Sequence, residues 1–199
     1  MEVYFGHKIA FSLSFLWRKL DSMPDDPPGS QVFGMGIENC EGFLIAYPVG
    51  IKDTMPFNDP QAVIDGIHNA LADDQALIEV KSGYARGRNH IYSIVKTKKQ
   101  PSGVQYVLTM DVAGSDGAFH VQGFFDEVGI TGQRDAMIYE MKRKDGSVGN
   151  DFTGWMADPY DANCQKEYLM NLSELEEYDS MFPSHPLTIA REIARKLPK

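Results

Sequence analysis

The chain has 199 residues, of which 43% are hydrophobic and 24% are charged, the proportions of an ordinary folded protein. A chain of this length fits one domain and can bury a core without a disulfide or a structural metal. Its formal net charge of −9 argues against general binding to nucleic acid or to an anionic membrane surface. No apolar run approaches the roughly 18 residues that a membrane span requires.

Cysteine usage and the opening segment bear on the cellular compartment. Cys40 and Cys164 lie far apart and match neither zinc nor redox spacing, so we expect two reduced thiols. The opening MEVYFGHKIAFSLSFLW is apolar, but Glu2, His7 and Lys8 interrupt it and no small-residue cleavage site follows. These features predict a cytoplasmic protein.

The first half of the chain predicts strands followed by one clear helix. Strands are expected over 4–15, 32–40 and 42–49. The segment 21–30 holds three prolines and is therefore expected to be a loop. Asp59 and Pro60 can begin a helix as cap and first-turn residue. The apolar stripe of this helix is formed by Val63, Ile64, Ile67, Ala70 and Leu71.

A run of strands at hairpin spacing follows the helix. These strands are expected over 76–84, 90–98, 104–112 and 118–125. The first turn lies within 85–89, where Gly87 and Asn89 tolerate a positive φ, and the last is at 114–117. Because most of the strands can pair with sequence neighbours, we predict an α+β fold: an antiparallel, meander-like β-sheet flanked by helices.

The remaining residues predict a C-terminal helical tail. A short helix is expected from Ala136, and a further helix opens at Asp158. Ser173 and Glu176 match a capping box, and Ser184 can cap the last helix. The apolar face of that helix holds Leu187, Ala190, Ile193, Ala194 and Leu197. We therefore expect a sheet domain over 1–157 and a helical extension over 158–199 packed on it, together forming one domain.

The stretch FHVQGFFDEVGITGQRD, 119–135, contains a histidine, three acids and an arginine. We interpret it as a strand that turns into a helix, with Thr131 as the cap and Arg134 free to reach Asp126, Glu127 or a main-chain carbonyl. His120 lies roughly 20 Å from these acids along an extended strand. The stretch is therefore not expected to be a catalytic cluster.

Charge is segregated along the chain. From Lys81 to Gln100 there are six cations and no acid, whereas 140–179 is strongly acidic. The cations can be solvated edges of a strand pair or a site for an acidic partner, and the acidic tail can also fold back on them. As a site, arginine forks there would grip carboxylates or phosphates. The candidate binding residues are Arg86, Arg88, His90, Lys96, Lys98 and Lys99.

Reactive motifs are not found in the sequence. The histidines show no pair at helical spacing, so helical metal ligation is not indicated, and only His90 and His120 could meet across strands. His185 is expected to be a loop residue rather than a catalyst. Phosphate-binding loops, nucleophile elbows and dinucleotide-binding glycine motifs are missing. We therefore expect neither a cofactor nor a metal.

Part of the chain resembles a known family. The segments GFLIAYPV, DPQAVIDGIHNAL, ALIEVKSGYARGRNHIYSIVK, VQYVLTMDV and the strand–helix junction at 119–135 occur in an order that resembles the PsbP-like fold. That fold is shared by the photosystem extrinsic protein and the Ran-binding Mog-type import factor. The resemblance covers about half the chain and implies a non-catalytic adaptor. It transfers no site residues, and the acidic tail departs from it.

Three functions follow as hypotheses. The leading one is a cytoplasmic, non-catalytic binding or accessory module that contacts a protein partner through the basic hairpin or the acidic tail. The second is an enzyme that binds a small anionic substrate through Arg86 and Arg88 and uses His90 or His120 as base. The third is an immunity-type inhibitor whose acidic tail blocks a basic toxin. The oligomeric state is not indicated by the sequence.

Overall fold

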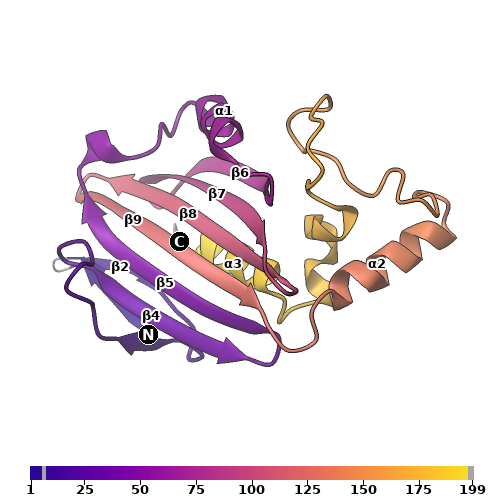
Figure 1. Ribbon diagram of the computed structural model, residues 1–199. Helices are drawn as coiled ribbons and strands as arrows, with labels where there is room; N and C mark the ends of the chain where they lie inside the picture. Colours follow the sequence, from indigo (N-terminus) through magenta and orange to yellow (C-terminus); the bar gives the residue numbers. More distant parts are fainter. Residues whose placement is uncertain (6–7, 197–199) are drawn as a thin grey trace.

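The computed structural model describes residues 1–5 and 8–196, with the backbone alone for residues 4, 5 and 8–10. His7 and Leu197, which enter the predictions above, lie outside the described residues. The described part contains a seven-stranded antiparallel sheet in the order β3-β4-β5-β9-β8-β7-β6 and a two-stranded sheet, β1-β2 (Figure 1). Helices flank the large sheet, so the predicted α+β class is confirmed.

The strands run over β1 Glu2–Phe5, β2 Lys8–Ser12, β3 Arg18–Leu20, β4 Gln31–Ile37, β5 Cys40–Val49, β6 Gln75–Ala85, β7 Arg88–Lys98, β8 Val104–Gly114 and β9 Gly117–Glu127. The helices are α1 Pro60–Ala70, α2 Gln133–Lys144 and α3 Pro186–Lys196, with shorter 3-10 turns η1 Ile51–Asp53, η2 Leu172–Glu174 and η3 Glu176–Met181. None of the helices in the described part of the chain is long and apolar enough to cross a bilayer.

Strands β6 to β9 form the predicted meander. The β6–β7 turn has two residues, Arg86 with φ 49° and Gly87 with φ 81°, which is the backbone shape that matches the twist of a hairpin. Asn89, which we also expected to adopt a positive φ, lies within β7 instead. Strand β9 also pairs with β5, a strand distant in sequence, and this pairing joins the meander to β3, β4 and β5.

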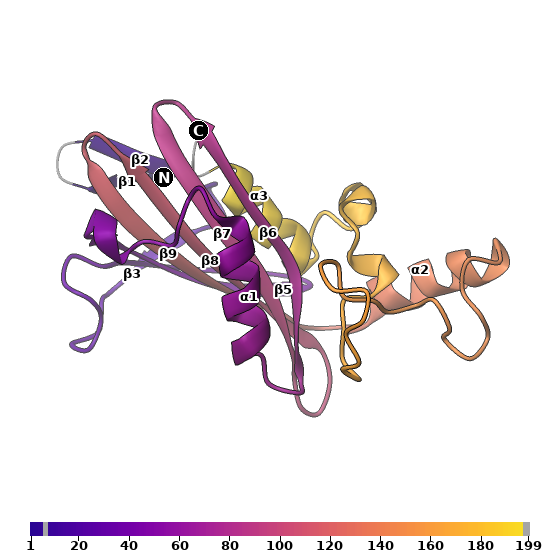
Figure 2. The ribbon, with the colours of Figure 1, turned by 90° about the horizontal axis from the view of Figure 1, so that it is seen from above.

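The two faces of the large sheet are covered by different elements. Figure 2 shows α1 on one side of the sheet and α3 with the β1–β2 hairpin on the other. The α3 side holds the main core, in which Leu187 and Ala190 pack on β8 and β9 side chains such as Leu108 and Val121. On the other side, α1 covers β6 and β7 alone, with Val63 and its neighbours against Leu77, Val80 and Ile91.

The alternation of β8 and β9 explains why the sheet has its main core on the α3 side. Side chains at every second position, such as Leu108, Met110 and Val121, are fully buried against α3. Their neighbours of opposite orientation, including Val107 and Phe124, are only half-buried. The α1 side of the central strands is therefore less completely covered.

Two predicted elements, one near each end of the chain, differ from the structure. The segment expected as one strand over 4–15 forms parts of two paired strands, β1 and β2, with residues 6 and 7 outside the described part. The segment 158–171, expected to open a helix, contains none. There Asp158 accepts hydrogen bonds from the backbone N–H groups of Tyr160 and Asp161, which closes a local turn in place of a helical one.

Asp59 caps α1 as predicted, but the caps after β9 lie elsewhere than predicted. The capping box is formed by Asn171 and Glu174, two residues earlier than the predicted Ser173–Glu176 pair. Helix α2 begins after Gly132, whose φ of 72° and missing side-chain bond show that Thr131 does not cap it. Beyond α2, Ile138, Val148, Trp155 and Tyr178 form a small separate core, so α2 and its loop stand away from the sheet (Figure 1).

Candidate functional site

The predicted basic surface does not come together in the structure. Arg86 and Arg88 lie at one end of β7 and Lys98 and Lys99 at the other, about 33 Å apart at the rise of a strand. Arg88 is paired with Asp116 at 3.1 Å, while Arg86 and Lys98 are exposed. The six predicted binding residues are therefore divided between two ends of the sheet.

Lys96 is not a surface residue, contrary to the prediction. Its side chain points into the main core because it shares the orientation of Tyr92 and Ile94 on β7. It is 1% exposed, lies 2.8 Å from Glu174 Oε2 and sits over the ring of Tyr168. A buried cation needs such a partner, so this lysine joins the sheet to the C-terminal extension.

The acidic tail folds back on the cations of the sheet, one of the alternatives left open by the sequence. Lys81 on β6 bonds Glu176 at 2.8 Å, and Lys96 on β7 bonds Glu174 at 2.8 Å. Lys99 pairs with Asp126 of β9 at 2.9 Å. Several of the segregated cations are thus paired with acidic side chains inside the fold.

Two buried arginines hold the extension in place. Arg134 donates to the carbonyls of Ser173 and Leu175 and to Asp179. Arg191 on α3 donates to Glu79, to Asp179 and to the carbonyl of Glu174. Both are 1% exposed, and their donors are directed at backbone and carboxylate acceptors. Arg134 thus bonds main-chain carbonyls, one of its predicted alternatives, and not Asp126 or Glu127.

His90 and His120 lie on opposite faces of the sheet. In the strand register His90 is level with Val112 of the main core, whereas His120 is level with Asp111 on the α1 side. His120 Nδ1 lies 2.7 Å from Asp111, and burial lowers the pKa of His90. Neither a shared metal site nor a joint acid–base site can form from this pair.

Other reactive arrangements are missing from the described residues. No group of three or more histidine, cysteine, aspartate or glutamate side chains among them could hold a metal ion. Both cysteines are free, as expected. Burial, together with the charges of Asp126 and Glu41, raises the pKa of Cys40 to about 12, so this thiol stays protonated at neutral pH.

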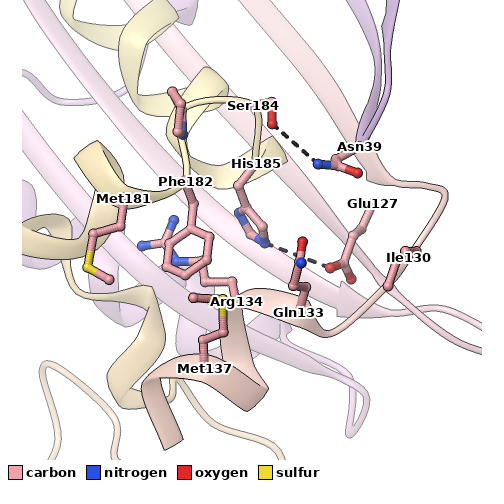
Figure 3. Close-up of a pocket in the computed structure, with 11 residues that line it drawn as sticks. Asn39, Glu127, Ile130, Gln133, Arg134, Met137, Met181, Phe182, Ser184 and His185 are labelled. Atoms are coloured by element: carbon pink, nitrogen blue, oxygen red, sulfur yellow. Dashed lines mark hydrogen bonds and ion pairs between the residues drawn. The ribbon is translucent and has the colours of Figure 1, made fainter. Parts of the chain in front are cut away.

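A half-open pocket of about 210 Å³ lies where the β9–α2 turn, α2 and the η3–α3 connection meet (Figure 3). Met137, Met181 and Phe182 form an apolar side, and Ile130 adds an apolar side chain across from them, beside Glu127. The other side is polar and is formed by Asn39, Glu127, Gln133, Ser184 and His185. Ile130 is 75% exposed and the two methionines are each 47% exposed, so the apolar side forms the rim.

The polar floor of the pocket is made by chain turns. After β9 the backbone reverses through Gly129 and Gly132, both at positive φ, and Glu127 Oε1 accepts the Gly132 N–H at 2.8 Å. His185 precedes Pro186, the first residue of α3, and its Nδ1 accepts the Leu187 N–H at 3.2 Å. His185 therefore caps α3, and Ser184, the predicted cap, accepts a bond from Asn39 instead.

The electrostatics of the floor fix the protonation of His185. Burial and the charges of Arg134 and Arg191 lower the pKa of His185 to about 3, so the imidazole is neutral at pH 7. Because Nδ1 accepts a hydrogen bond, the proton is on Nε2. Burial raises the pKa of Glu127, an effect opposed by the Gly132 N–H. The His185 Nε2 and Glu127 Oε1 atoms are 3.9 Å apart, which is too far for a hydrogen bond.

The pocket can bind a group, but its geometry offers little to a reaction. Its Arg134 is committed to carbonyls and Asp179, and the imidazole is too weak a base at a pKa of about 3 to take a proton near neutral pH. What it offers a ligand is the His185 N–H donor and the Glu127 carboxylate acceptor, with the polar side chains of Gln133 and Ser184 beside them, and an adaptable apolar rim. Sequence reasoning gave Glu127 and His185 roles in turns and did not bring them together.

Comparison with known proteins adds one similarity. No protein-family model matches the chain, and no curated protein matches its sequence. Among solved structures it is similar to the solution structure of cyanobacterial PsbP (CyanoP) from Synechocystis sp. PCC 6803, with a TM-score of 0.40 and 14% identity over 73% of this chain and 95% of that chain. Because this similarity is low, we assign the α+β class from the strands and helices of the structure alone. The resemblance to the Mog-type import factor stays a prediction.

Proposed function

We propose that this protein is a non-catalytic binding module that receives a side chain of a protein partner in the pocket between α2 and α3. The observation that carries the proposal is an exposed apolar rim above a buried polar floor. The volume of about 210 Å³ is below the roughly 300–1,000 Å³ of typical small-molecule sites. It corresponds to about seven water molecules at ~30 Å³ each, which suits one side chain of a partner.

The rim has the character of an adaptable docking surface. Met137 projects from α2 and Met181 from the end of η3, so two separate elements offer flexible thioether side chains to the same opening. Methionine fits irregular partners and contacts aromatic rings favourably. Ile130 extends the apolar rim along the β9–α2 turn. A single anchor inserted there would be enclosed by the apolar rim, which excludes water from it as the surroundings of interaction hot spots do.

Catalysis is disfavoured by how the nearby charges are used. The buried groups that would activate a substrate, Arg134, Arg191 and Asp179, bond to one another or to backbone carbonyls. The two histidines of the enzyme hypothesis lie on opposite faces of the sheet. We place the module in the cytoplasm as part of the same proposal, supported by its two free cysteines.

A peptide library tests this proposal. The immobilised full chain is used to select binders from a library of random twelve-residue peptides, and selected peptides are measured against variants Met137→Glu and Met181→Glu. We expect each variant to weaken binding at least about tenfold, because burying a methionine contributes roughly 1.5–3 kcal/mol and a carboxylate cannot replace it.

Met141→Glu is the matched control. Met141 is also a half-exposed methionine on α2, one turn further along, but it does not line the pocket. This control should bind the selected peptides as the wild type does. Selected peptides that bind Met137→Glu and Met181→Glu as tightly as the wild type, or a library that yields no binders, would refute the proposed function.

A further inference from the structure

The polar floor of the pocket carries a donor and an acceptor that are not bonded to each other. His185 Nε2 and Glu127 Oε1 face each other across 3.9 Å, a separation that leaves both able to bond a third group (Figure 3). His185 and Glu127 are 9% and 8% exposed, and both line the opening. The fold therefore holds a fixed donor beside a fixed acceptor at the bottom of an accessible pocket.

The identity of the donor and the acceptor is set by helix capping. His185 Nδ1 accepts the Leu187 N–H, so Nε2 carries the hydrogen and can only donate. Glu127 accepts the Gly132 N–H with Oε1, and each carboxylate oxygen has two lone pairs, so a further bond can be accepted. A bound group must consequently accept from one residue and donate to the other.

We propose that the side chain received in this pocket is a carboxamide, that of glutamine or asparagine. Its carbonyl oxygen accepts from His185 Nε2–H, and its NH₂ donates to Glu127. The methylene groups of such a side chain pack on Met137 and Phe182 at the apolar wall. This inference rests on the proposed function, because it names the partner group that the pocket selects.

Competing groups satisfy the pair less well. A carboxylate would meet Glu127 with like charge, and an ammonium group would leave the histidine donor without an acceptor. A hydroxyl can accept and donate, but one oxygen bridging 3.9 Å with bonds of ~2.8 Å holds its partners at about 90°. A carboxamide uses two atoms, so each hydrogen bond keeps a favourable direction.

Three small probes of similar shape test the proposal: benzamide, benzoate and benzyl alcohol. Each is titrated into the ¹⁵N-labelled full chain, and dissociation constants come from the amide signals of Gly132 and Leu187, which bond to the two floor residues. We expect benzamide to bind at least about tenfold more tightly than either of the others. Benzyl alcohol binding equally well, or probes that leave both signals unmoved, would overturn the inference.

Two variants separate recognition from folding. His185→Asn keeps a good helix cap but removes the Nε2–H, so the preference for benzamide over benzyl alcohol should fall to near one. Glu127→Gln keeps an acceptor for Gly132 N–H and removes the charge, so benzoate should gain affinity relative to benzamide. An unchanged preference in a folded His185→Asn variant would also overturn the inference.

The two proposals can fail independently. If methionine variants abolish peptide binding but the probes show no preference for benzamide, the pocket is a docking site without carboxamide selectivity. If benzamide is preferred but selected peptides ignore the methionine substitutions, the floor recognises carboxamides and the protein-docking function is wrong.

Discussion

The β6–β9 meander and the C-terminal extension over 158–199 are held together by different kinds of hydrogen bond. In the meander, each strand pairs with the next in sequence, and its backbone groups are satisfied by a continuous ladder. In the extension, distant side chains bond the backbone: Arg134 of α2 donates to the Ser173 and Leu175 carbonyls. In the other direction, Lys166 of the extension donates to the Leu71 carbonyl at the end of α1. Because the meander is built by local pairing, it can be predicted from the sequence. The fold of the extension depends on hydrogen bonds to residues far away in the chain and cannot be predicted in this way.

The largest expected effect comes from removing Arg134. An Arg134→Leu variant removes the buried donor of the Ser173 and Leu175 carbonyls and one of the two arginines that donate to Asp179, the other being Arg191. We expect the free energy of unfolding to fall by about 4 kcal/mol, the usual cost of breaking a buried charged pair. Urea unfolding measures the loss. Hydrogen exchange should accelerate first at Trp155 and Leu172 and only later in β8.

Two further variants test whether this loss of stability is specific to the buried arginine and to the extension. Arg143→Leu, on the same helix but exposed and paired only with Glu140, should change stability by less than about 0.5 kcal/mol. Leu108→Ala in the centre of β8 should cost about 3 kcal/mol and reduce protection in the sheet and the extension together, because α3 packs on that strand. If Arg134→Leu unfolds at the urea midpoint of the wild type, the extension is not held as we describe.

The fold could be read from the sequence wherever neighbours in sequence pair. Alternation over 104–112 and turn residues such as Gly87 placed β8 and the β6–β7 hairpin correctly. The pairing of β9 with β5 is not encoded locally, because the two strands are separated by α1 and three strands. The segment 158–171 is not helical as predicted. Asp158 accepts a bond from the backbone N–H of Tyr160 and so forms a turn, and the Tyr160 hydroxyl bonds Val80 of β6, a contact that the local sequence does not indicate.

The free energy of unfolding should depend on pH through His185. The folded pKa of His185 is about 3, below the ordinary value of 6.5, so protonation favours the unfolded chain. Its contribution to stability is complete above pH 6.5 and is lost as pH falls toward 3, by about 1.4 kcal/mol per pH unit. At pH 5 the wild type should therefore have lost about 2 kcal/mol from this residue.

His185→Asn should remove this dependence while keeping the cap of α3. Urea unfolding between pH 7 and 5 compares the two proteins, and the difference in their slopes isolates His185. Ser184→Ala retains the imidazole and should follow the wild type. Parallel pH profiles of the wild type and His185→Asn would show that His185 is not held neutral by its surroundings.

The candidate site was less predictable than the fold. Its parts were assigned locally. Glu127 was placed at a strand end, which agrees with its bond to Gly132, but His185 was placed in a loop with Ser184 as the cap, whereas His185 itself caps α3. What the sequence could not supply is the packing of α3 on β9, which brings residues 58 positions apart to 3.9 Å. Lys96 shows the converse: its charge indicated a surface, but its orientation on β7 buries it against Glu174.

The basic hairpin that the sequence favoured is tested by removing Arg88. Arg88 pairs with Asp116 near the β8–β9 turn, and both side chains are about one-fifth exposed. A surface pair of this kind contributes at most about 1 kcal/mol, so Arg88→Ala should be nearly as stable as the wild type in urea. The peptides selected by the pocket should bind it without change, because this hairpin lies at the far end of the sheet from β9's last residue, Glu127. Loss of peptide binding in Arg88→Ala or Arg86→Glu, with the fold intact, would move the interface back to the hairpin and away from α2.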